Sequence, residues 1–265
     1  MNRLDRILAV PLTFFSLLVP AVIMALATQV SLADLKEAIF HPETFFALRF
    51  SLMTSVAAMA VAIIIGIPSA YFMARSNFPF KGVLETILEL PLVMPPLIVG
   101  VGLLFLLGQG MLGGPLAKLG ISFIFNPLGA VAAQAFIAVP IVMKSAGSAF
   151  SSVDRGYEEV AETLGLNPLT VFLKVNIPLA GRNLLSGMVL AWARTMGEFG
   201  GTLMLAGATR FRTETLPIAV YLNISSGETG IAISCALVLL VAAFILLLVS
   251  RIFRKNGNGN RGGYY

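Results

Sequence analysis

Three polar side chains recur at four-residue intervals inside a long apolar stretch of this sequence. Arg194, Glu198 and Thr202 stand at positions i, i+4 and i+8, so on a helix they would form one polar stripe. With a rise of about 1.5 Å per residue, Arg194 would lie roughly 15 Å from the inner end of that helix, near the middle of a bilayer. Ionisable groups are costly at that depth, and they suggest a functional site.

Two interpretations of the stripe stay open. Arg194 and Glu198 can form a structural ion pair that neutralises both charges inside a bundle. Alternatively the stripe can line a translocation pathway or gate, and Arg194 is then the side chain suited to contact an anion. Beside it, small residues let another helix approach closely, which predicts helix packing or a dimer seam. These small residues are Ala193, Gly197 and Gly201.

Two adjacent prolines interrupt another apolar stretch near its middle. Pro95 and Pro96 can produce an ordinary kink in a membrane helix. Alternatively the backbone there is unwound and its N–H groups line the pathway. Neutral donors of that kind suit a bulky, weakly held oxyanion.

The composition favours a membrane protein. The 265 residues are 57% hydrophobic and only 12% charged, with a mean hydropathy of +0.90, whereas a soluble domain is about 25% charged. The single cysteine, Cys235, excludes an intrachain disulfide and a cysteine metal site. The single histidine excludes a histidine cluster, so we expect no metal site and no catalytic residues. The net charge of +5 comes from residues that flank apolar segments, which argues against nucleic-acid binding.

Six stretches are long and apolar enough to cross a bilayer as helices. They predict an all-α polytopic membrane protein with one transmembrane domain over residues 1–255, followed by a disordered Gly/Asn-rich tail at 256–265. The first stretch is longer than the core of a signal peptide, so we expect a retained anchor. The predicted spans are 7–28, 50–74, 86–108, 127–147, 184–206 and 230–250.

The distribution of Lys and Arg orients these spans in the cytoplasmic (inner) membrane. With the N-terminus inside, 12 of the 18 basic residues lie on the inner side and five on the outer side, while Arg194 lies within a span. Positive residues are enriched in cytoplasmic loops. Both termini and the loop at 151–183 are therefore predicted to be cytoplasmic.

The loop at 151–183 has the pattern of two short helices around a turn. Asp154 and Asn167 are suited to cap the two helix starts, Gly165 to end the first helix in the left-handed conformation, and Pro168 to open the second. Pro178 is expected to stop or bend the second helix. The hairpin can lie on its own bundle or on the lipid surface, or it can present a helix to a groove on a cytoplasmic partner.

This loop resembles the "EAA" coupling loop of ABC-transporter permeases, whose pattern is E-A-A-x3-G-x9-I-x-L-P. Val160 replaces the second motif residue, and Val175 and Ile177 are conservative departures from the pattern. The resemblance implies that the loop docks on an ATP-hydrolysing subunit. The residues implied in this coupling are Glu158, Glu159, Ala161, Gly165, Leu166, Pro168 and Pro178.

The chain has no G-x-x-x-x-G-K-[ST] phosphate loop, so the ATPase is expected to be a separate polypeptide. This chain is then a transport subunit and no enzyme. It would bind no cofactor of its own, and ATP and Mg would be bound by the partner.

Three further segments are similar to permeases of the molybdate type: ARSNFPFKG at 74–82, LPLVMPP at 90–96 and ARTMGEFG at 193–200. Tungstate and sulfate permeases share much of this pattern. The resemblance implies a type I importer fold and a homodimer with two ATPase copies. It also implies one extracytoplasmic oxyanion-binding protein and transport by alternating access. A secondary anion transporter or channel is the alternative from a different class.

Overall fold

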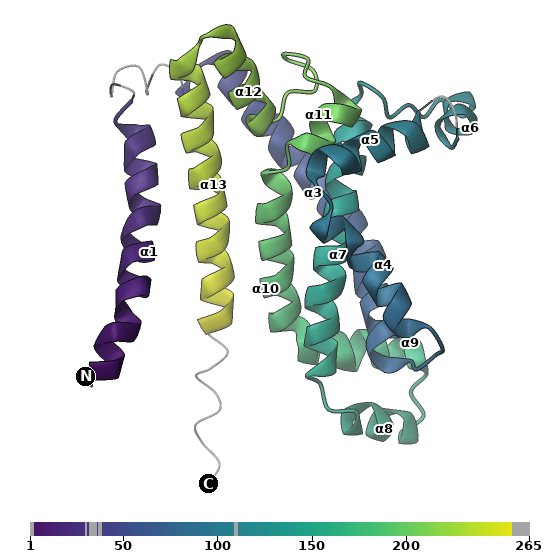
Figure 1. Ribbon diagram of the computed structural model, residues 1–265. Coiled ribbons are helices and arrows are strands. Elements are labelled where there is room, and N and C mark those ends of the chain that lie inside the picture. The colour runs from purple at the N-terminus through teal and green to yellow at the C-terminus, as the bar shows by residue number, and fades with distance from the viewer. Residues whose placement is uncertain (1–2, 30, 32–35, 37–38, 109–110, 256–265) are drawn as a thin grey trace.

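The computed structural model describes residues 3–29, 31, 36, 39–108 and 111–255, and within them it contains helices and no strand (Figure 1). The predicted tail at 256–265 lies outside the described residues. In chain order the elements are α1 (Arg3–Ala27), α3 (Pro42–Arg75), α4 (Lys81–Val93), α5 (Pro96–Leu107), α6 (Gly113–Lys118), α7 (Pro127–Ser151), α8 (Gly156–Thr163), α9 (Pro168–Val171), the π-helical segment η1 (Phe172–Asn176), α10 (Ile177–Met196), α11 (Gly200–Ala206), α12 (Leu216–Ser226) and α13 (Thr229–Lys255).

Four helices are long and apolar enough to cross a membrane, and they coincide with the first, second, fourth and sixth predicted spans. Their starts follow local chemistry. The side chain of Asn126 accepts a hydrogen bond from the Leu128 N–H at 3.1 Å, and Pro127 occupies the first turn of α7. An Asn cap followed by proline is a favoured helix start, because proline has no N–H to leave unpaired.

The third predicted span, 86–108, is not one helix. It is divided into α4 and α5, which are bent by 110° at a break containing Met94 and Pro95. Pro95 and Pro96 both lack a backbone N–H, and a residue before proline is driven out of the helical conformation, so the helix stops and restarts. The break is much larger than an ordinary proline kink.

The fifth predicted span, 184–206, is also broken. Helix α10 ends at Met196 and α11 begins at Gly200. The prediction of one continuous helix was wrong here: the chain leaves the helix at residues 197–199, and the Glu198 carboxylate accepts the Gly201 N–H of the new helix at 3.0 Å. Counted by length and composition, the described chain has four membrane-spanning candidates, or up to five if α4 and α5 form one span.

The core of the bundle lies where α3, α7 and α10 pack together. Small side chains line this contact: Ala62 and Ala138 are fully buried, and a Cβ added to Gly66 would lie 3.0 Å from Val142. Small residues let helix backbones approach closely, which supplies packing in the absence of a water-driven hydrophobic effect. Figure 1 shows that the start of α1, the end of α13 and helices α8 and α9 lie at one end of the bundle, with α12 at the other.

Candidate functional site

Helices α8 and α9 form the predicted helix–turn–helix. Gly165 is in the left-handed conformation with φ +83°, as predicted. Its N–H donates to the Glu162 carbonyl at 2.9 Å, and the Leu166 N–H donates to the Ala161 carbonyl at 3.2 Å. These two bonds form a Schellman motif, which satisfies the last carbonyls of α8.

Of the two predicted caps of these helices, one is confirmed and the other is displaced by one residue. The Asn167 side chain accepts from the Thr170 N–H at 2.8 Å, which confirms it as the cap of α9. Asp154 lies one residue before the cap position of α8, and its carboxylate accepts from the Gly156 N–H at 2.9 Å. The turn between the helices therefore has a defined shape.

Pro178 does not stop the second helix. Instead α9, η1 and α10 follow one another without interruption from Pro168 to Met196. The Ile177 N–H bonds to the Phe172 carbonyl, five residues earlier, so the chain makes a wide π turn directly before the proline. A wider turn relieves the clash that the proline ring would have with the preceding turn.

The tip of this loop exposes apolar side chains. Val160 is 62% exposed, Leu164 77% and Leu169 65%, and Glu159 is exposed beside them. Within α8, only Ala161 is buried. An exposed apolar patch at the end of the bundle, beyond the core contacts, is typical of a binding surface.

Glu158 has a different environment from its neighbour Glu159. Its carboxylate pairs with the Arg75 guanidinium at 2.6 Å, and the two side chains are only 15% and 12% exposed. Glu158 and Ala161 therefore face the bundle, while Gly165, Leu166, Pro168 and Pro178 are exposed.

Arg194 and Glu198 form an ion pair of 3.2 Å across the end of α10. The carboxylate is buried and its second oxygen accepts from Gly201 N–H, whereas 48% of the arginine side chain is exposed. Thr202 is buried in α11, and its hydroxyl has no partner among the described residues, so the continuous three-residue stripe does not form. The pair places a positive charge beside the buried Glu198 carboxylate, while about half of the Arg194 side chain stays exposed.

Glycines allow close packing between α5 and α11, the second halves of the two broken spans. A Cβ at Gly200 would lie 3.0 Å from Pro96, and one at Gly100 would lie 2.9 Å from the Gly201 Cα. Gly201 therefore packs against α5, as expected for a small residue. Gly197 is exposed, and a Cβ added there would meet only the Arg194 carbonyl among the described residues, whereas Ala193 is half-buried.

A cavity of about 260 Å³ lies beside the bend between α4 and α5. Among the described residues that line it, Arg194 is the only charged one. The others are apolar or proline: Pro91, Leu92, Val93, Met94, Pro95, Pro96, Ile137 and Ile141. The structure thus places Arg194 in the same cavity as Pro95 and Pro96, although Arg194 is far from the two prolines in the sequence.

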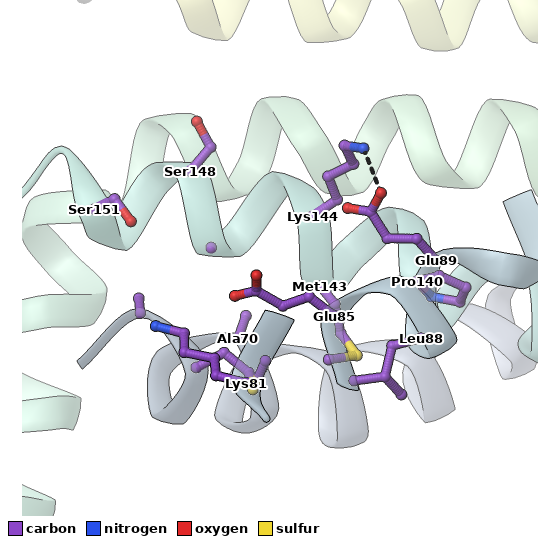
Figure 2. A pocket seen from close by; sticks show the side chains of 13 residues that line it. Ala70, Lys81, Glu85, Leu88, Glu89, Pro140, Met143, Lys144, Ser148 and Ser151 are labelled. Carbon is purple, nitrogen blue, oxygen red and sulfur yellow. Dashed lines mark hydrogen bonds and ion pairs between the residues drawn. The ribbon is translucent and has the colours of Figure 1, made fainter. Parts of the chain in front are cut away.

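A second cavity of about 260 Å³ lies between α3, α4 and α7 and is lined by charged and hydroxyl side chains together with apolar ones (Figure 2). Lys144 of α7 pairs with Glu89 of α4 at 2.9 Å, and Lys81 and Glu85 come from the same helix as Glu89. Both members of the Lys144–Glu89 pair are about half-exposed. Charged side chains are costly against lipid, so water or another protein surface must cover this face.

A buried polar cluster, which sequence reasoning missed, lies at the end opposite the loop. Glu43 in α3 accepts from the Asn223 amide at 2.6 Å and lies 3.6 Å from the Arg210 guanidinium. Glu214 is fully buried near Glu43; one of its carboxyl oxygens accepts from the Phe211 N–H at 3.1 Å, and the other has no partner among the described residues. Two neighbouring buried carboxyl groups disfavour each other's charged form, so this cluster depends on pH.

Burial, followed by the effect of the neighbouring Glu43 side chain, raises the pKa of Glu214 from its ordinary 4.5 to about 7. Because the folded protein binds this proton more tightly than the unfolded chain, its stability should fall as pH rises from about 4.5 to about 7. Thermal unfolding of the purified protein at pH 5 and pH 8 measures this loss. Glu214→Gln should reduce the difference between the two pH values, and Glu228→Gln, at an exposed position, should not. An unchanged difference in Glu214→Gln would contradict the assignment.

Comparison with solved structures defines the class of protein. A crystal structure of a bacterial ABC transporter that imports the polysaccharide alginate matches with a TM-score of 0.71 at 14% identity, covering 96% of this chain and 99% of that one. An inward-facing methionine ABC transporter matches with a TM-score of 0.62 at 16% identity, covering 78% and 92%. The fold is that of a type I ABC importer permease.

Sequence comparison gives the family. Residues 62–256 match the family model described as "binding-protein-dependent transport system inner membrane component", and the chain belongs to that family. Relatives include the molybdenum transport system permease protein ModB of Mycobacterium tuberculosis, 36% identical over 84% of this chain and 86% of that protein. ModB of Escherichia coli K12 is 37% identical over 79% and 94%.

Proposed function

We propose that this chain is the membrane-embedded subunit of an ATP-driven importer that moves an oxyanion, molybdate, into the cell. The observation that carries this proposal is the similarity, over most of the chain, to permeases named for molybdenum transport. The cavity lined by Arg194 supports it, because one partly exposed guanidinium among apolar walls suits a divalent oxyanion in transit.

Two copies of the chain would form the transport path. The half-exposed Arg194 and the charged face in Figure 2 need a polar or protein covering within the membrane, and a second copy enclosing a water-filled path supplies it. Gly197, where an added Cβ would meet only the Arg194 carbonyl among the described residues, and the half-buried Ala193 would contribute to that seam. The six predicted spans and the cytoplasmic location of both termini belong to this proposal.

The energy source would be a separate ATPase, present in two copies, that binds ATP and Mg. Its docking surface would be the exposed apolar tip formed by Val160, Leu164 and Leu169 with Glu159. ATP binding would bring the two docking loops together and open the path outward to an extracytoplasmic binding protein. Hydrolysis would reset the path. This chain itself would carry no catalytic residue and no cofactor.

Reconstitution tests this function against its alternatives. Purified permease with its ATPase and binding protein should take up labelled molybdate into proteoliposomes only when ATP is supplied. Uptake driven by an ion gradient without ATP would instead identify a secondary transporter or channel. Competition by tungstate and sulfate separates the oxyanions, and preferential uptake of sulfate would contradict the assignment of molybdate.

A further inference from the structure

Arg75, the last residue of α3, is the centre of a buried polar contact at the loop end of the bundle. Its guanidinium pairs with Glu158 at 2.6 Å, donates to the Val153 carbonyl at 3.1 Å and donates to the Asn176 side-chain oxygen at 3.4 Å. Only 12% of its side chain is exposed. A buried guanidinium with three partners has little freedom to move independently of them.

The three partners of Arg75 belong to different parts of the docking segment. Val153 lies in the link after α7, Glu158 in α8, and Asn176 in the π segment η1. Arg155, from the same link, donates back to the Arg75 carbonyl at 3.4 Å. Helix α8 and the segment η1 that follows α9 are therefore both bonded to the end of α3. Helix α3 extends along most of the bundle (Figure 1).

A second layer extends this contact into the core. The Asn176 amide donates to the Tyr71 hydroxyl at 3.3 Å. The Tyr71 ring packs on Phe150 and Phe172, with centroid distances of 5.3 and 4.7 Å. The rings join α3, α7 and the π segment, so Asn176 connects the polar contact to the packed interior.

The helix that passes through this contact also reaches the candidate pathway. From Pro168 at the docking tip it continues through η1 and α10 to Met196, two residues beyond Arg194. Contiguous packed side chains and rigid helices can carry energetic coupling between distant sites. A movement of the docking tip can thus reach Arg194 along one helix, provided that the loop moves with the bundle and does not yield at its links.

We propose that Arg75 is the positioning residue that makes the docking segment, α3 and α10 move together, so that ATPase motion reaches the oxyanion path. This inference rests on the proposed function. Arg75 contacts neither oxyanion nor nucleotide in this assignment. Without it, the link around Val153 and the turn around Gly165 would absorb the movement, and ATP would be hydrolysed without transport.

The test compares Arg75→Gln, Arg75→Lys and Glu158→Gln in the complete transporter, reconstituted with ATPase and binding protein in liposomes. The readout is molybdate taken up per ATP hydrolysed. Arg75→Gln should lower this ratio at least about tenfold, because it removes the guanidinium from all three of its partners. Arg75→Lys, which keeps the charge but not the forked geometry, should recover part of the ratio. Arg212→Gln removes an exposed arginine between α11 and α12, and should leave the ratio unchanged.

A purely structural role would act differently. If Arg75 only stabilised the fold, its loss would lower the thermal unfolding temperature and the amount of co-purified ATPase. The transporter that still assembled would take up the wild-type amount of molybdate per ATP hydrolysed. Such a result in Arg75→Gln overturns the inference. If Arg75→Gln does not fold, Glu158→Gln decides, because it removes the ion pair and leaves the other two bonds of Arg75 in place; a wild-type ratio there also overturns it. Wild-type transporter without ATP-driven uptake would refute the proposed function itself.

Discussion

Replacement of Arg194 by alanine is expected to reduce ATP-driven molybdate uptake about ten- to a hundredfold, while the ATPase still assembles with the permease. One hydrogen bond to a charged group is worth about 1.5–3 kcal/mol, which corresponds to that range. The guanidinium is the only charged group lining the cavity at the α4–α5 bend, so no other described side chain there can replace it.

The single variant has a second effect that must be separated from the first. Glu198 is 1% exposed, and without Arg194 it would be a buried carboxylate with only the Gly201 N–H as partner. Removing one member of a buried pair is strongly destabilising because the other charge stays uncompensated. Loss of transport in Arg194→Ala alone could therefore come from instability.

The double variant Arg194→Ala with Glu198→Gln separates the two roles. Glutamine can still accept from the Gly201 N–H but carries no charge, so the buried residue no longer needs a cation. If Arg194 contacts the oxyanion, the double variant should fold normally and still transport poorly. Recovery of uptake to the wild-type rate in the double variant would show that Arg194 serves only to neutralise Glu198. Initial uptake rates, normalised to assembled complex by co-purification, provide the measurement.

The local chemistry of the docking loop could be predicted from the sequence because it depends on neighbours. Asn167 caps the N–H three residues ahead, and Gly165 ends α8 through bonds within the same turn. Hydropathy likewise located four of the long helices, since apolar length alone determines whether a segment can span a bilayer.

The helix breaks could be predicted only in part. Pro95 and Pro96 indicated an interruption, but the 110° bend depends on α11 packing against α5 through glycines such as Gly200. For the fifth span, the hydropathy pattern continues across Gly197, and the break depends on Glu198 turning back to accept an N–H of the following helix. A periodic pattern does not contain that information.

The polar contacts between distant segments left no local signal at all. Arg75 and Asn176 are 101 residues apart, and Glu43 and Asn223 are 180 apart. Each residue alone resembles an ordinary polar or charged side chain. Glu158 was therefore assigned to the docking surface together with Glu159, although adjacent residues on a helix point in different directions and Glu158 faces Arg75.

Replacement of Gly165 by proline should abolish coupling between ATP hydrolysis and transport. Gly165 has φ +83°, whereas proline fixes φ near −65°, and its N–H, which donates to the Glu162 carbonyl, would be lost. The Schellman turn could not form, so α8 and α9 would no longer present Val160, Leu164 and Leu169 on one surface. We expect at least a tenfold loss of co-purified ATPase and of ATP-driven uptake, roughly the effect of losing the apolar contacts that these three side chains would make with the ATPase.

Added side-chain atoms would not by themselves cause the loss expected for Gly165→Pro, because a Cβ at Gly165 would meet no described atom within 4 Å. Gly165→Asn therefore provides the matched comparison: asparagine tolerates the left-handed conformation and keeps the N–H, so docking and uptake should stay near wild type. Gly181→Ala, in α10 with equally open space, controls for glycine replacement in a helix. Equal loss in Gly165→Asn and Gly165→Pro would mean that the open space around Gly165 is occupied by the partner, and that backbone conformation is not what docking requires. Normal ATPase binding in Gly165→Pro would mean that the ATPase docks elsewhere on the chain.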